Sequence, residues 1–403
     1  MIDEDSARAQ VLAAVRAGTT VSVGLAEAVG RWAAERVVAT VALPGFDNSA
    51  MDGYAVHSED CGQTDRWLSL AGEMAAGRAP VGDGLGWPEV RPGQAVRIFT
   101  GAPLPRGAAA VVMQEDVEVV ADGSIRVGEA ATPGDFIRRA GADVSVGQKL
   151  IERCDRLTPG RIGLLASQGR TSVAVTIRPR VLVITTGDEV VAAGEPLPHA
   201  GSIYNSNGPM LAALASQSGA IVDCRHGRDD PATLAAVVAD GLESHDFLLI
   251  AGGVSVGQYD AVKPALEALG WRPDLWRVAV KPGKPFLFAD CGGRGVFGVP
   301  GNPVSGFVTY HLFVAPALRK WQGAPEIEWL PPTAPGTLAS AIGNPGDRPH
   351  YVRGVLDAKG GFRSAGLQES HALLSLSRSN ALLRVPPGAQ WEAGRAVMIH
   401  PVH

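Results

Sequence analysis

The chain has 403 residues, of which 46% are apolar and 19% charged, and its formal net charge at pH 7 is −5. This length exceeds what one hydrophobic core supports and predicts two to four domains, and the apolar content excludes an intrinsically disordered chain. The negative charge, without a basic run, argues against a general nucleic-acid binder but is compatible with a local cationic pocket.

The cysteine pattern and the N-terminus bear on the cellular compartment in which the protein is expected. The four cysteines are far apart and form no Cys-x-x-Cys pair, so a zinc site or redox dithiol is not expected: Cys61, Cys154, Cys224 and Cys291. The N-terminus is acidic, unlike a signal peptide, and no apolar run is long enough to span a membrane. We expect a cytoplasmic protein that contacts neither membrane nor nucleic acid.

The N-terminal 172 residues predict two kinds of structure. Apolar spacing predicts helices near residues 6–17 and 24–36. From residue 46 to 138 short alternating runs separated by Gly/Pro turns predict a small β domain. A further helix is expected over residues 157–166. If it packs back on the N-terminal helices, the β domain is an insertion.

The next part of the chain, residues 173–323, alternates strands and helices. Strands are expected at residues 181–184, 220–222, 247–250 and 277–280, followed by a hairpin over 286–289 and 295–299. Helices are expected at residues 208–218, 231–242, 261–269 and 304–320. This alternation predicts a doubly wound, mainly parallel sheet. Residues 324–403 follow a Pro-rich linker and predict another small β domain.

Five polar loops end apolar runs between residues 181 and 305. They occupy residues 185–189, 205–208, 252–260, 281–285 and 300–305. The carboxyl ends of parallel strands meet at one edge of a sheet, where glycine allows backbone N–H groups to approach an anion and lysine neutralises it. Five such loops in series predict a site that handles phosphate or another oxyanion.

Each loop also has an ordinary explanation. The loop that contains Gly252, Gly253, Ser255 and Gly257 is, alone, more often a tight turn between strand and helix, and Asp260 after it is compatible with a helix cap. Lys281 and Lys284 are held by prolines and a glycine, which favours an anion site over a solvated turn. Arg277, four residues earlier, adds a donor fork or is simply a solvated arginine.

The carboxylates after the strands suggest a divalent cation. Glu189, Asp229 and Asp260 follow three consecutive predicted strands, a pattern typical of Mg²⁺ with phosphate partners. Taken singly, Asp229 is better explained as part of a helix cap, and Pro300, Asn302 and Ser305 as a turn and a capping hydroxyl. The histidines have no metal-ligand spacing, and the turn-forming segments 47–56 and 100–103 do not by themselves require a function.

Several of these segments occur together in one known family. They are residues 46–55, 97–102 and 138–144, the five loops, and the pairs Arg353-Gly354 and Ser370-His371. In this order the chain resembles, over essentially its whole length, the molybdopterin molybdenumtransferases, a family that includes bacterial MoeA and the E domains of plants and of gephyrin.

The resemblance implies a fold of four parts. They are a helical part (1–45 and 139–172), an inserted β domain (46–138), a three-layer α/β/α molybdopterin-binding domain (173–323) and a β-barrel-like domain (324–403). It also implies a homodimer and a reaction that consumes adenylylated molybdopterin and molybdate with Mg²⁺, releases AMP and yields the molybdenum cofactor. Further implied partners are other proteins of cofactor biosynthesis and the recipient molybdoenzymes.

The resemblance also implies site residues. Those carried over as catalytic are Asp52, Thr100, Asp143, Glu189, Asp229, Asp260 and Lys281. Those carried over as contacts of the cofactor or oxyanion are Gly252, Gly253, Ser255, Gly257, Arg277, Lys281, Lys284, Pro300, Asn302, Ser305, Arg353 and Ser370. The implied metal ligands are Glu189, Asp229 and Asp260. Asp52 and Thr100 are implied to lie in a cleft that the partner protomer completes.

The sequence departs from the family at positions with no catalytic group. Gln258 stands where many relatives have an acid, Arg277 where some have lysine, Ala142 where Glu is common and Gly45 where Pro is common. Two other functions remain open. One is a molybdopterin adenylyltransferase, which shares the α/β domain, and the other is a non-catalytic molybdopterin-binding scaffold. Segments 47–55 and 100–103 favour the insertion enzyme over the first, and the retained acids and lysines argue against the second.

Overall fold

The computed structural model describes residues 1–77, 88–120, 123–254 and 260–402, so the predicted site residues Ser255 and Gly257 lie outside the described part. The chain forms two compact units. The first consists of Met1–Glu35, Arg153–Gly163 and Thr171–His403, and the second of Arg36–Glu152 and Leu164–Arg170. The second unit is thus inserted in the sequence of the first.

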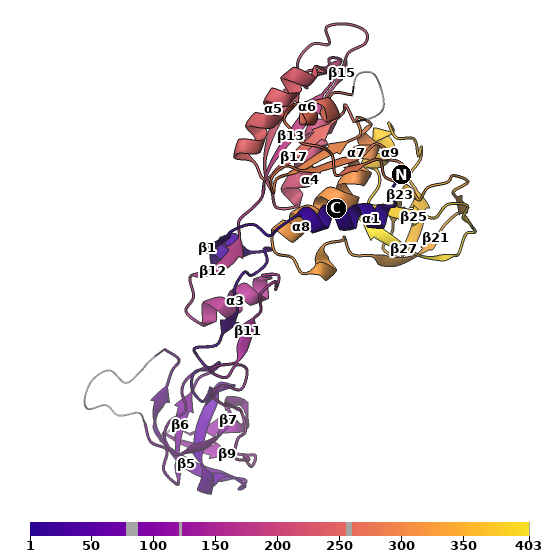
Figure 1. Cartoon of the computed structure of the whole chain (residues 1–403). Coiled ribbons are helices and arrows are strands. Elements are labelled where there is room, and N and C mark those ends of the chain that lie inside the picture. The colour runs from indigo at the N-terminus through magenta and orange to yellow at the C-terminus, as the bar shows by residue number, and fades with distance from the viewer. Residues whose placement is uncertain (78–87, 121–122, 255–259, 403) are drawn as a thin grey trace. The chain divides into compact units, whose positions relative to one another are not determined.

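The first unit is built on a six-stranded sheet (Figure 1). Its order is β16 (Ile221–Gly227), β13 (Arg180–Thr186), β17 (Phe247–Ala251), β20 (Gly295–Val299), β19 (Leu287–Asp290) and β18 (Leu275–Trp276). The first four strands are parallel, and β19 pairs antiparallel with β20 on one side and with β18 on the other. The expectation of a mainly parallel sheet with a final hairpin is therefore confirmed.

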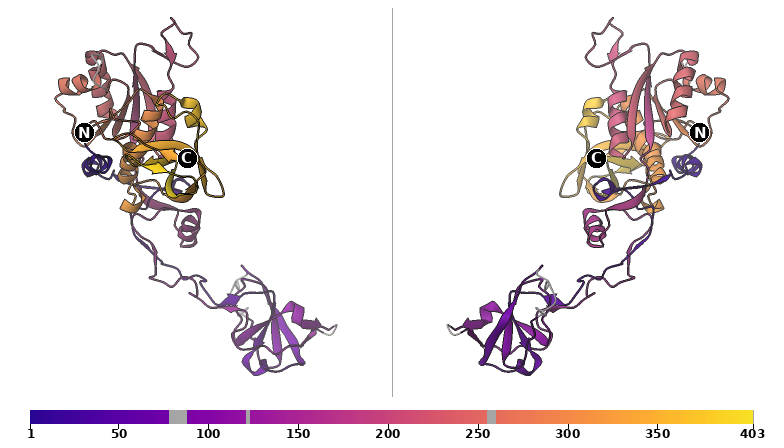
Figure 2. Two further views of the ribbon diagram at one scale, coloured as in Figure 1. Left: turned by 90° about the vertical axis from the view of Figure 1, so that its right-hand side faces the viewer. Right: turned by 90° about the vertical axis from the view of Figure 1, so that its left-hand side faces the viewer.

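Helices cover both faces of this sheet (Figure 2). On β13, Val181 and Val183 pack into one core with Leu211 of α4 (Asn207–Gln217), while Leu182 packs into a second core with Leu234 of α5 (Pro231–Ser244). The first core also holds α7 (Pro303–Thr309), a π-helical turn (Tyr310–Val314) and α8 (Ala315–Trp321), and the second holds α6 (Val262–Ala268). Alternate residues of buried strands point to opposite faces, and this produces the three-layer α/β/α arrangement.

One predicted strand was wrong. The strand expected at residues 277–280 is β18, Leu275–Trp276, two residues earlier. Arg277 adopts φ 69°, a left-handed conformation that ends an extended segment. Its guanidinium lies over the Trp276 ring, 4.4 Å from the ring centroid.

The N-terminal helices differ from expectation in length. The first, α1 (Glu4–Ala14), begins after Asp3, whose carboxylate accepts a hydrogen bond from the Ser6 amide at 2.9 Å. It contacts α8, where Lys320 Nζ donates to Leu12 O at 2.6 Å. The second expected helix, 24–36, is only α2 (Leu25–Ala28), because Gly30 with φ 79° terminates it.

The C-terminal residues form a closed five-stranded barrel, as expected. Its strands are β21 (Ala334–Leu338), β24 (Gly361–Ser364), β23 (His350–Leu356), β25 (Ala381–Val385) and β27 (Ala396–Pro401). A short pair, β22 (Ile342–Gly343) with β26 (Gln390–Trp391), and the helix α9 (Leu373–Ser377) complete this part. The barrel interior is filled by apolar side chains that include Phe362, Val352 and Leu383.

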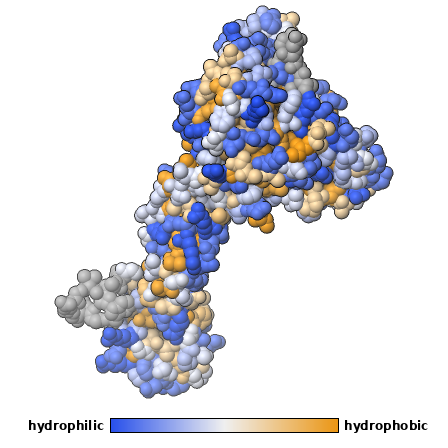
Figure 3. Space-filling view, viewed as in Figure 1, coloured by the Kyte–Doolittle hydropathy of each residue, from blue (hydrophilic) through white to orange (hydrophobic). Residues whose placement is uncertain are grey.

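Smaller elements complete the first unit. The strands are β1 (Thr20–Gly24), which pairs with β12 (Ser172–Thr176), and β14 (Val190–Val191), which pairs with β15 (Ile203–Tyr204). A 3₁₀ turn spans Glu326–Glu328. On the face that Figure 3 draws, hydrophilic residues are spread over this unit, with smaller hydrophobic patches between them.

The second unit contains a six-stranded β-sheet. Its order is β7 (Ala108–Met113), β4 (Gly53–His57), β6 (Gln94–Ile98), β5 (Arg66–Met74), β9 (Ser124–Val127) and β8 (Val117–Val119). The second unit also contains two short antiparallel strand pairs. They are β2 (Val37–Val38) with β11 (Lys149–Ile151), and β3 (Asn48–Ser49) with β10 (Ile137–Arg138). Ser58–Asp60 and Gln114–Asp116 are 3₁₀ turns, and α3 (Pro159–Ser167) begins in the first unit and ends in the second. Among the described residues, no helix has the length and hydropathy needed to cross a bilayer.

Candidate active site

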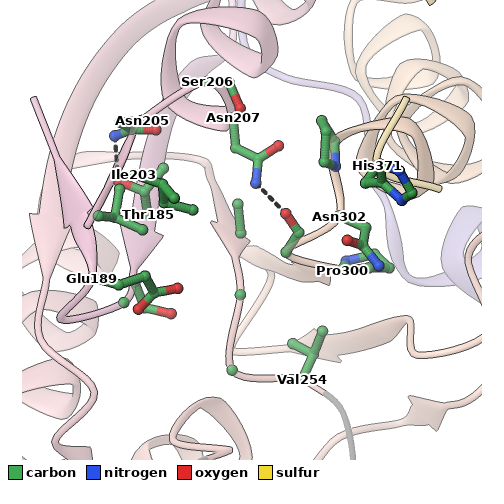
Figure 4. A pocket seen from close by; sticks show the side chains of 18 of the residues that line it. Thr185, Glu189, Ile203, Asn205, Ser206, Asn207, Val254, Pro300, Asn302 and His371 are labelled. Atoms are coloured by element: carbon green, nitrogen blue, oxygen red, sulfur yellow. Dashed lines mark hydrogen bonds between the residues drawn. The ribbon is translucent and has the colours of Figure 1, made fainter. Parts of the chain in front are cut away.

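A pocket of about 770 Å³ opens at the carboxyl ends of β13, β17 and β20. The end of each strand and the loop after it contribute to the lining, through residues 185–187 and 189, 251–254 and 300–303 (Figure 4). This is the edge of a doubly wound sheet where ligands bind. Seven predicted site residues line it together: Glu189, Asp229, Gly252, Gly253, Asp260, Pro300 and Asn302.

Two adjacent glycines allow the β17 loop to pass close to β13. Gly252 and Gly253 have φ of 103° and 62°, which L-residues rarely adopt. A Cβ at position 252 would stand 2.6 Å from the Thr186 hydroxyl oxygen. The glycines therefore serve the packing of the two loops, and any side chain at Gly252 would intrude between them.

Two asparagines tie the remaining loops together. Asn205 donates to the Thr185 hydroxyl at 2.8 Å and accepts from the Gly208 amide at 2.9 Å at the start of α4. Asn207 donates to Gly301 O at 2.6 Å (Figure 4). These amides were noticed in the sequence only as part of a polar loop, and the structure identifies them as residues that fix the pocket walls.

The carboxylates of the pocket repel one another. Burial is the main cause that raises the pKa of Asp229, and the nearby charges of Glu189 and Asp188 raise it further. One Asp229 oxygen accepts a hydrogen bond from the Asp188 amide at 3.4 Å, which acts in the opposite direction. Such a place favours a bound cation, because a positive charge offsets the repulsion between the acids.

The next question is whether the carboxylates of this pocket can hold a metal ion. Within the described residues no group of three His, Cys, Asp or Glu side chains is close enough to hold an ion alone. Mg²⁺ in phosphate-handling sites is commonly held by one or two carboxylates, with waters and the substrate's phosphates completing its shell. Glu189 and Asp229 fit that mode, whereas a closed protein cage does not fit.

The two lysines lie on a segment pinned to the barrel. The Lys281 amide donates to Pro349 O at 2.9 Å, and the Tyr351 amide donates to Lys281 O at 2.8 Å. Both lysine side chains are exposed, and neither lines the pocket, although Pro285 does. Arg277 also lies outside the lining.

The last predicted contacts, Ser305, Arg353 and Ser370, do not line the pocket. Ser305 is buried in α7, and the Val304 amide donates to Ser370 O at 3.1 Å. Arg353 is fully buried in β23, where its guanidinium donates to Leu367 O at 2.6 Å and Glu369 O at 3.2 Å. In this structure Arg353 therefore holds the loop that leads to Ser370 rather than lining the pocket.

His371, which follows Ser370, does line the pocket. No metal-like spacing marked it in the sequence, and it was set aside with the other histidines. The available signal was its place in the Ser370-His371 pair.

Three predicted residues belong to the second unit. Asp52 and Thr100, 48 residues apart, meet directly: the Thr100 amide and hydroxyl both donate to one Asp52 oxygen at 2.7 Å. These bonds, the amide first, hold the pKa of the Asp52 carboxyl below its usual value. Asp143 is exposed, and its amide donates to Leu43 O at 2.9 Å.

The sequence segments around these residues converge. Gly101 N donates to Ser49 O at 2.9 Å, and Arg139 donates to Asp47 at 2.6 Å. Segments 46–55, 97–102 and 138–144 are therefore neighbours in the second unit.

Together, the mainly parallel α/β sheet and the pocket with acidic residues at its strand ends define a doubly wound α/β domain with a ligand-sized site. Comparison with known families makes this specific. Residues 2–169 match the MoeA N-terminal region (domain I and II), residues 182–320 a "Probable molybdopterin binding domain" and residues 335–402 the MoeA C-terminal region (domain IV). The chain belongs to the MoeA family.

Individual relatives agree with this assignment. The chain is 37% identical to molybdopterin molybdenumtransferase 2 of Mycobacterium tuberculosis over 383 residues, 92% of each chain. It is 36% identical to the molybdopterin molybdenumtransferase of Haemophilus influenzae, covering 100% of this chain and 98% of the relative. The crystal structure of the molybdopterin biosynthesis MoeA protein from Pyrococcus horikoshii superposes with a TM-score of 0.83 at 28% identity, over 100% of both chains.

Proposed function

We propose that this chain inserts molybdenum into molybdopterin, as a transferase of molybdenum cofactor biosynthesis. Its substrates are adenylylated molybdopterin and molybdate, and AMP is released. The observation that carries the proposal is the pocket lined by Glu189, Asp229 and Asp260 on the part of the chain that matches the molybdopterin-binding family model.

The pocket suits a substrate with a phosphoanhydride. Its volume of about 770 Å³ is within the range of pockets that hold drug-sized ligands. When bound, Mg²⁺ would polarise phosphoryl oxygens and neutralise charge on the leaving AMP. Glu189 and Asp229 would hold that ion together with the substrate's phosphates, and the Asp260 carboxylate lies in the same lining.

Of the remaining predicted residues, the two lysines and Arg277 keep the implied role of contacts, whereas Ser305, Arg353 and Ser370 take a supporting role. Lys281 and Lys284, with Arg277, attract and position the molybdate dianion, while Ser305, Arg353 and Ser370 support the loops around it. Ser255 and Gly257, which lie outside the described residues, are proposed as further contacts of the cofactor. Asp52, Thr100 and Asp143 contribute from the second unit.

We propose further that the enzyme is a homodimer with a composite site. In this arrangement the surface of Asp52 and Thr100 faces the pocket of the partner subunit. Other partners are the proteins that supply adenylylated molybdopterin and the molybdoenzymes that receive the product. All four cysteines are free, which suits a reducing cytoplasm.

The test is incubation of the purified protein with adenylylated molybdopterin, Mg²⁺ and molybdate. AMP release and the formation of active cofactor are measured together. We expect both, each dependent on Mg²⁺ and with cofactor formation dependent on molybdate. Formation of adenylylated molybdopterin from molybdopterin and ATP would instead identify an adenylyltransferase, and tight binding without turnover would identify a scaffold.

A further inference from the structure

The first unit contains a second cavity, of about 670 Å³, that we call the arginine cavity. Four arginines line it: Arg31, Arg156, Arg178 and Arg319. They come from four distant parts of the chain, and the cavity shares no described lining residue with the candidate active site. The convergence of four cations in a chain of net charge −5 calls for a chemical explanation.

The protein offsets the positive charge of this cavity only in part, through Glu27 acting on Arg31 and Glu328 acting on Arg319. Among its described lining residues Glu328 is the one carboxylate, and this side chain accepts a hydrogen bond from Trp32 Nε1 at 2.9 Å. In the part of the chain that the structure describes, no carboxylate oxygen lies within 4.0 Å of any of the four guanidinium groups. Guanidinium groups stay protonated in proteins, so the charges persist at any physiological pH.

Backbone carbonyls hold three of the arginines in place. Arg31 donates to Thr176 O, Arg156 to Gly30 O at 3.3 Å and Arg319 to Trp329 O at 3.2 Å. Each contact uses one of the five N–H groups of a guanidinium. The side chains are therefore positioned by the fold, while donors remain for a ligand.

The arginines also lie close enough to repel one another. Burial lowers the pKa of Arg31, and neighbouring Arg178 adds to the effect. Burial likewise lowers the pKa of Arg319 and Arg156 lowers it further, while Tyr310 and Glu328 act in the opposite direction. Two pairs of like charges in a partly buried cavity raise the energy of the empty state, and a bound anion would relieve it.

The cavity floor is rigid and polar. The Tyr310 hydroxyl donates to Leu214 O at 2.9 Å and lies 2.7 Å from the Ser218 hydroxyl, and Gln322 Nε2 donates to Ser218 O at 2.7 Å. These hydrogen bonds join the lining groups to one another and fix their positions. Arg156 lies over the Trp32 ring, 5.7 Å from its centroid, which fixes one wall.

We propose that the arginine cavity binds a small phosphate-bearing anion with at least two negative charges. Arginine matches phosphate oxygens with paired N–H donors, and four such forks suit a ligand with two phosphoryl groups better than a monovalent anion. The cavity volume is ample for a ligand of that size. This site is additional to the candidate active site and independent of the proposed reaction.

The test uses inorganic pyrophosphate as the probe, measured by isothermal titration calorimetry at low ionic strength with the full-length protein. Arg178→Gln is the main variant, because this exposed side chain has no described bond to lose. We expect at least tenfold weaker binding, and a similar loss with Arg31→Gln. Arg272→Gln, an exposed arginine outside both cavities, is the matched control and should bind like wild type.

Binding at the lysines must be separated from binding in the cavity. Lys281→Gln/Lys284→Gln should leave the arginine-dependent binding unchanged while removing any pyrophosphate binding at the candidate active site. Thermal melting without ligand confirms that each variant is folded. The proposal is overturned if Arg178→Gln and Arg31→Gln bind pyrophosphate as wild type does, or if wild type shows no arginine-dependent binding at millimolar pyrophosphate. It is also overturned if both substitutions change the oligomeric state by light scattering without changing pyrophosphate affinity, since a protein surface then fills the cavity.

Discussion

Asp229 and Asp52 are aspartates in opposite environments. Asp229 lies in a pocket with Glu189 close by, and burial and neighbouring charge raise its pKa. Asp52 is exposed in the second unit, and two hydrogen bonds from Thr100 lower its pKa. The first environment favours a cation, whereas the second fixes a carboxylate as a permanent acceptor. We infer that the two units supply different chemistry to one reaction.

Removing the charge of Asp229 should have the largest effect. Asp229→Asn keeps the shape and the acceptor for the Asp188 amide, so we expect AMP release to fall on the order of a hundredfold through weaker Mg²⁺ binding. Because the pKa of folded Asp229 is raised, wild type loses stability as pH rises above the unfolded pKa of 3.8. The Asn variant should therefore melt at least as high as wild type at pH 7.

The measurement combines AMP release over a Mg²⁺ titration with a melting curve at pH 7. A variant that melts several degrees lower but retains its activity would show that Asp229 serves the fold. Asp230→Ala is the control, because Asp230 lies outside the pocket lining and caps α5 by accepting a hydrogen bond from Thr233 N at 2.7 Å. Its loss should affect melting rather than turnover.

The second prediction tests whether the two units act across subunits. Asp52→Ala and Asp229→Asn homodimers should each lose most of their AMP release, and mixing them should restore activity. Each heterodimer would hold one intact composite site and one doubly damaged site, so its activity should approach about half that of wild type. Subunit exchange is verified by native mass spectrometry. Confirmed exchange without recovery of activity would mean that one chain builds the whole site.

The third prediction concerns the exposed lysines. Lys281→Ala/Lys284→Ala should raise the molybdate concentration needed for half-maximal cofactor formation by about tenfold, because two cations near the oxyanion are lost. Single variants should show a smaller change and a steeper dependence on salt, since the remaining charge is screened. Exposed Lys359 in the barrel provides a matched control, Lys359→Ala. An unchanged molybdate response in the double variant would place the oxyanion elsewhere.

The smallest effect is expected at Thr100. Thr100→Val removes the hydroxyl but keeps the amide that bonds Asp52, so turnover should fall roughly fivefold. The pKa of Asp52, followed by NMR of its carboxyl carbon, should move up toward 3.8. Thr100→Ser keeps both donors and should match wild type in both measurements. Equal loss in the Ser variant would assign the effect to the threonine methyl group.

The central sheet could be predicted because its signals are local. Apolar runs of β13, β17 and β20 end in glycine or proline, and their loops meet wherever a parallel sheet forms. The helix expected at 24–36 and the strand expected at 277–280 failed for conformational reasons, namely the positive φ of Gly30 and of Arg277. The spacing of apolar residues along the sequence does not reveal which residue adopts a left-handed backbone conformation.

The pocket was only partly predictable. Its acids and glycines follow strands and were found, but the roles of Asn205 and Asn207 depend on loops folding together. The burial of Arg353 depends on barrel closure, since it comes from the pairing of β23 with β24 and β25. Likewise, 48 residues separate Asp52 from Thr100, and nothing in their local sequence predicts the bond.

The attachment of the lysine segment to the barrel limits how the protein can be divided. Lys281 exchanges backbone hydrogen bonds with Pro349 and Tyr351, and Arg348 donates to Val280 O at 3.2 Å. An excised α/β domain would keep its strands and acids but lose the scaffold that sets the lysine backbone. For protein engineering, the C-terminal barrel is therefore not a removable appendage, and a minimal catalytic fragment has to include it.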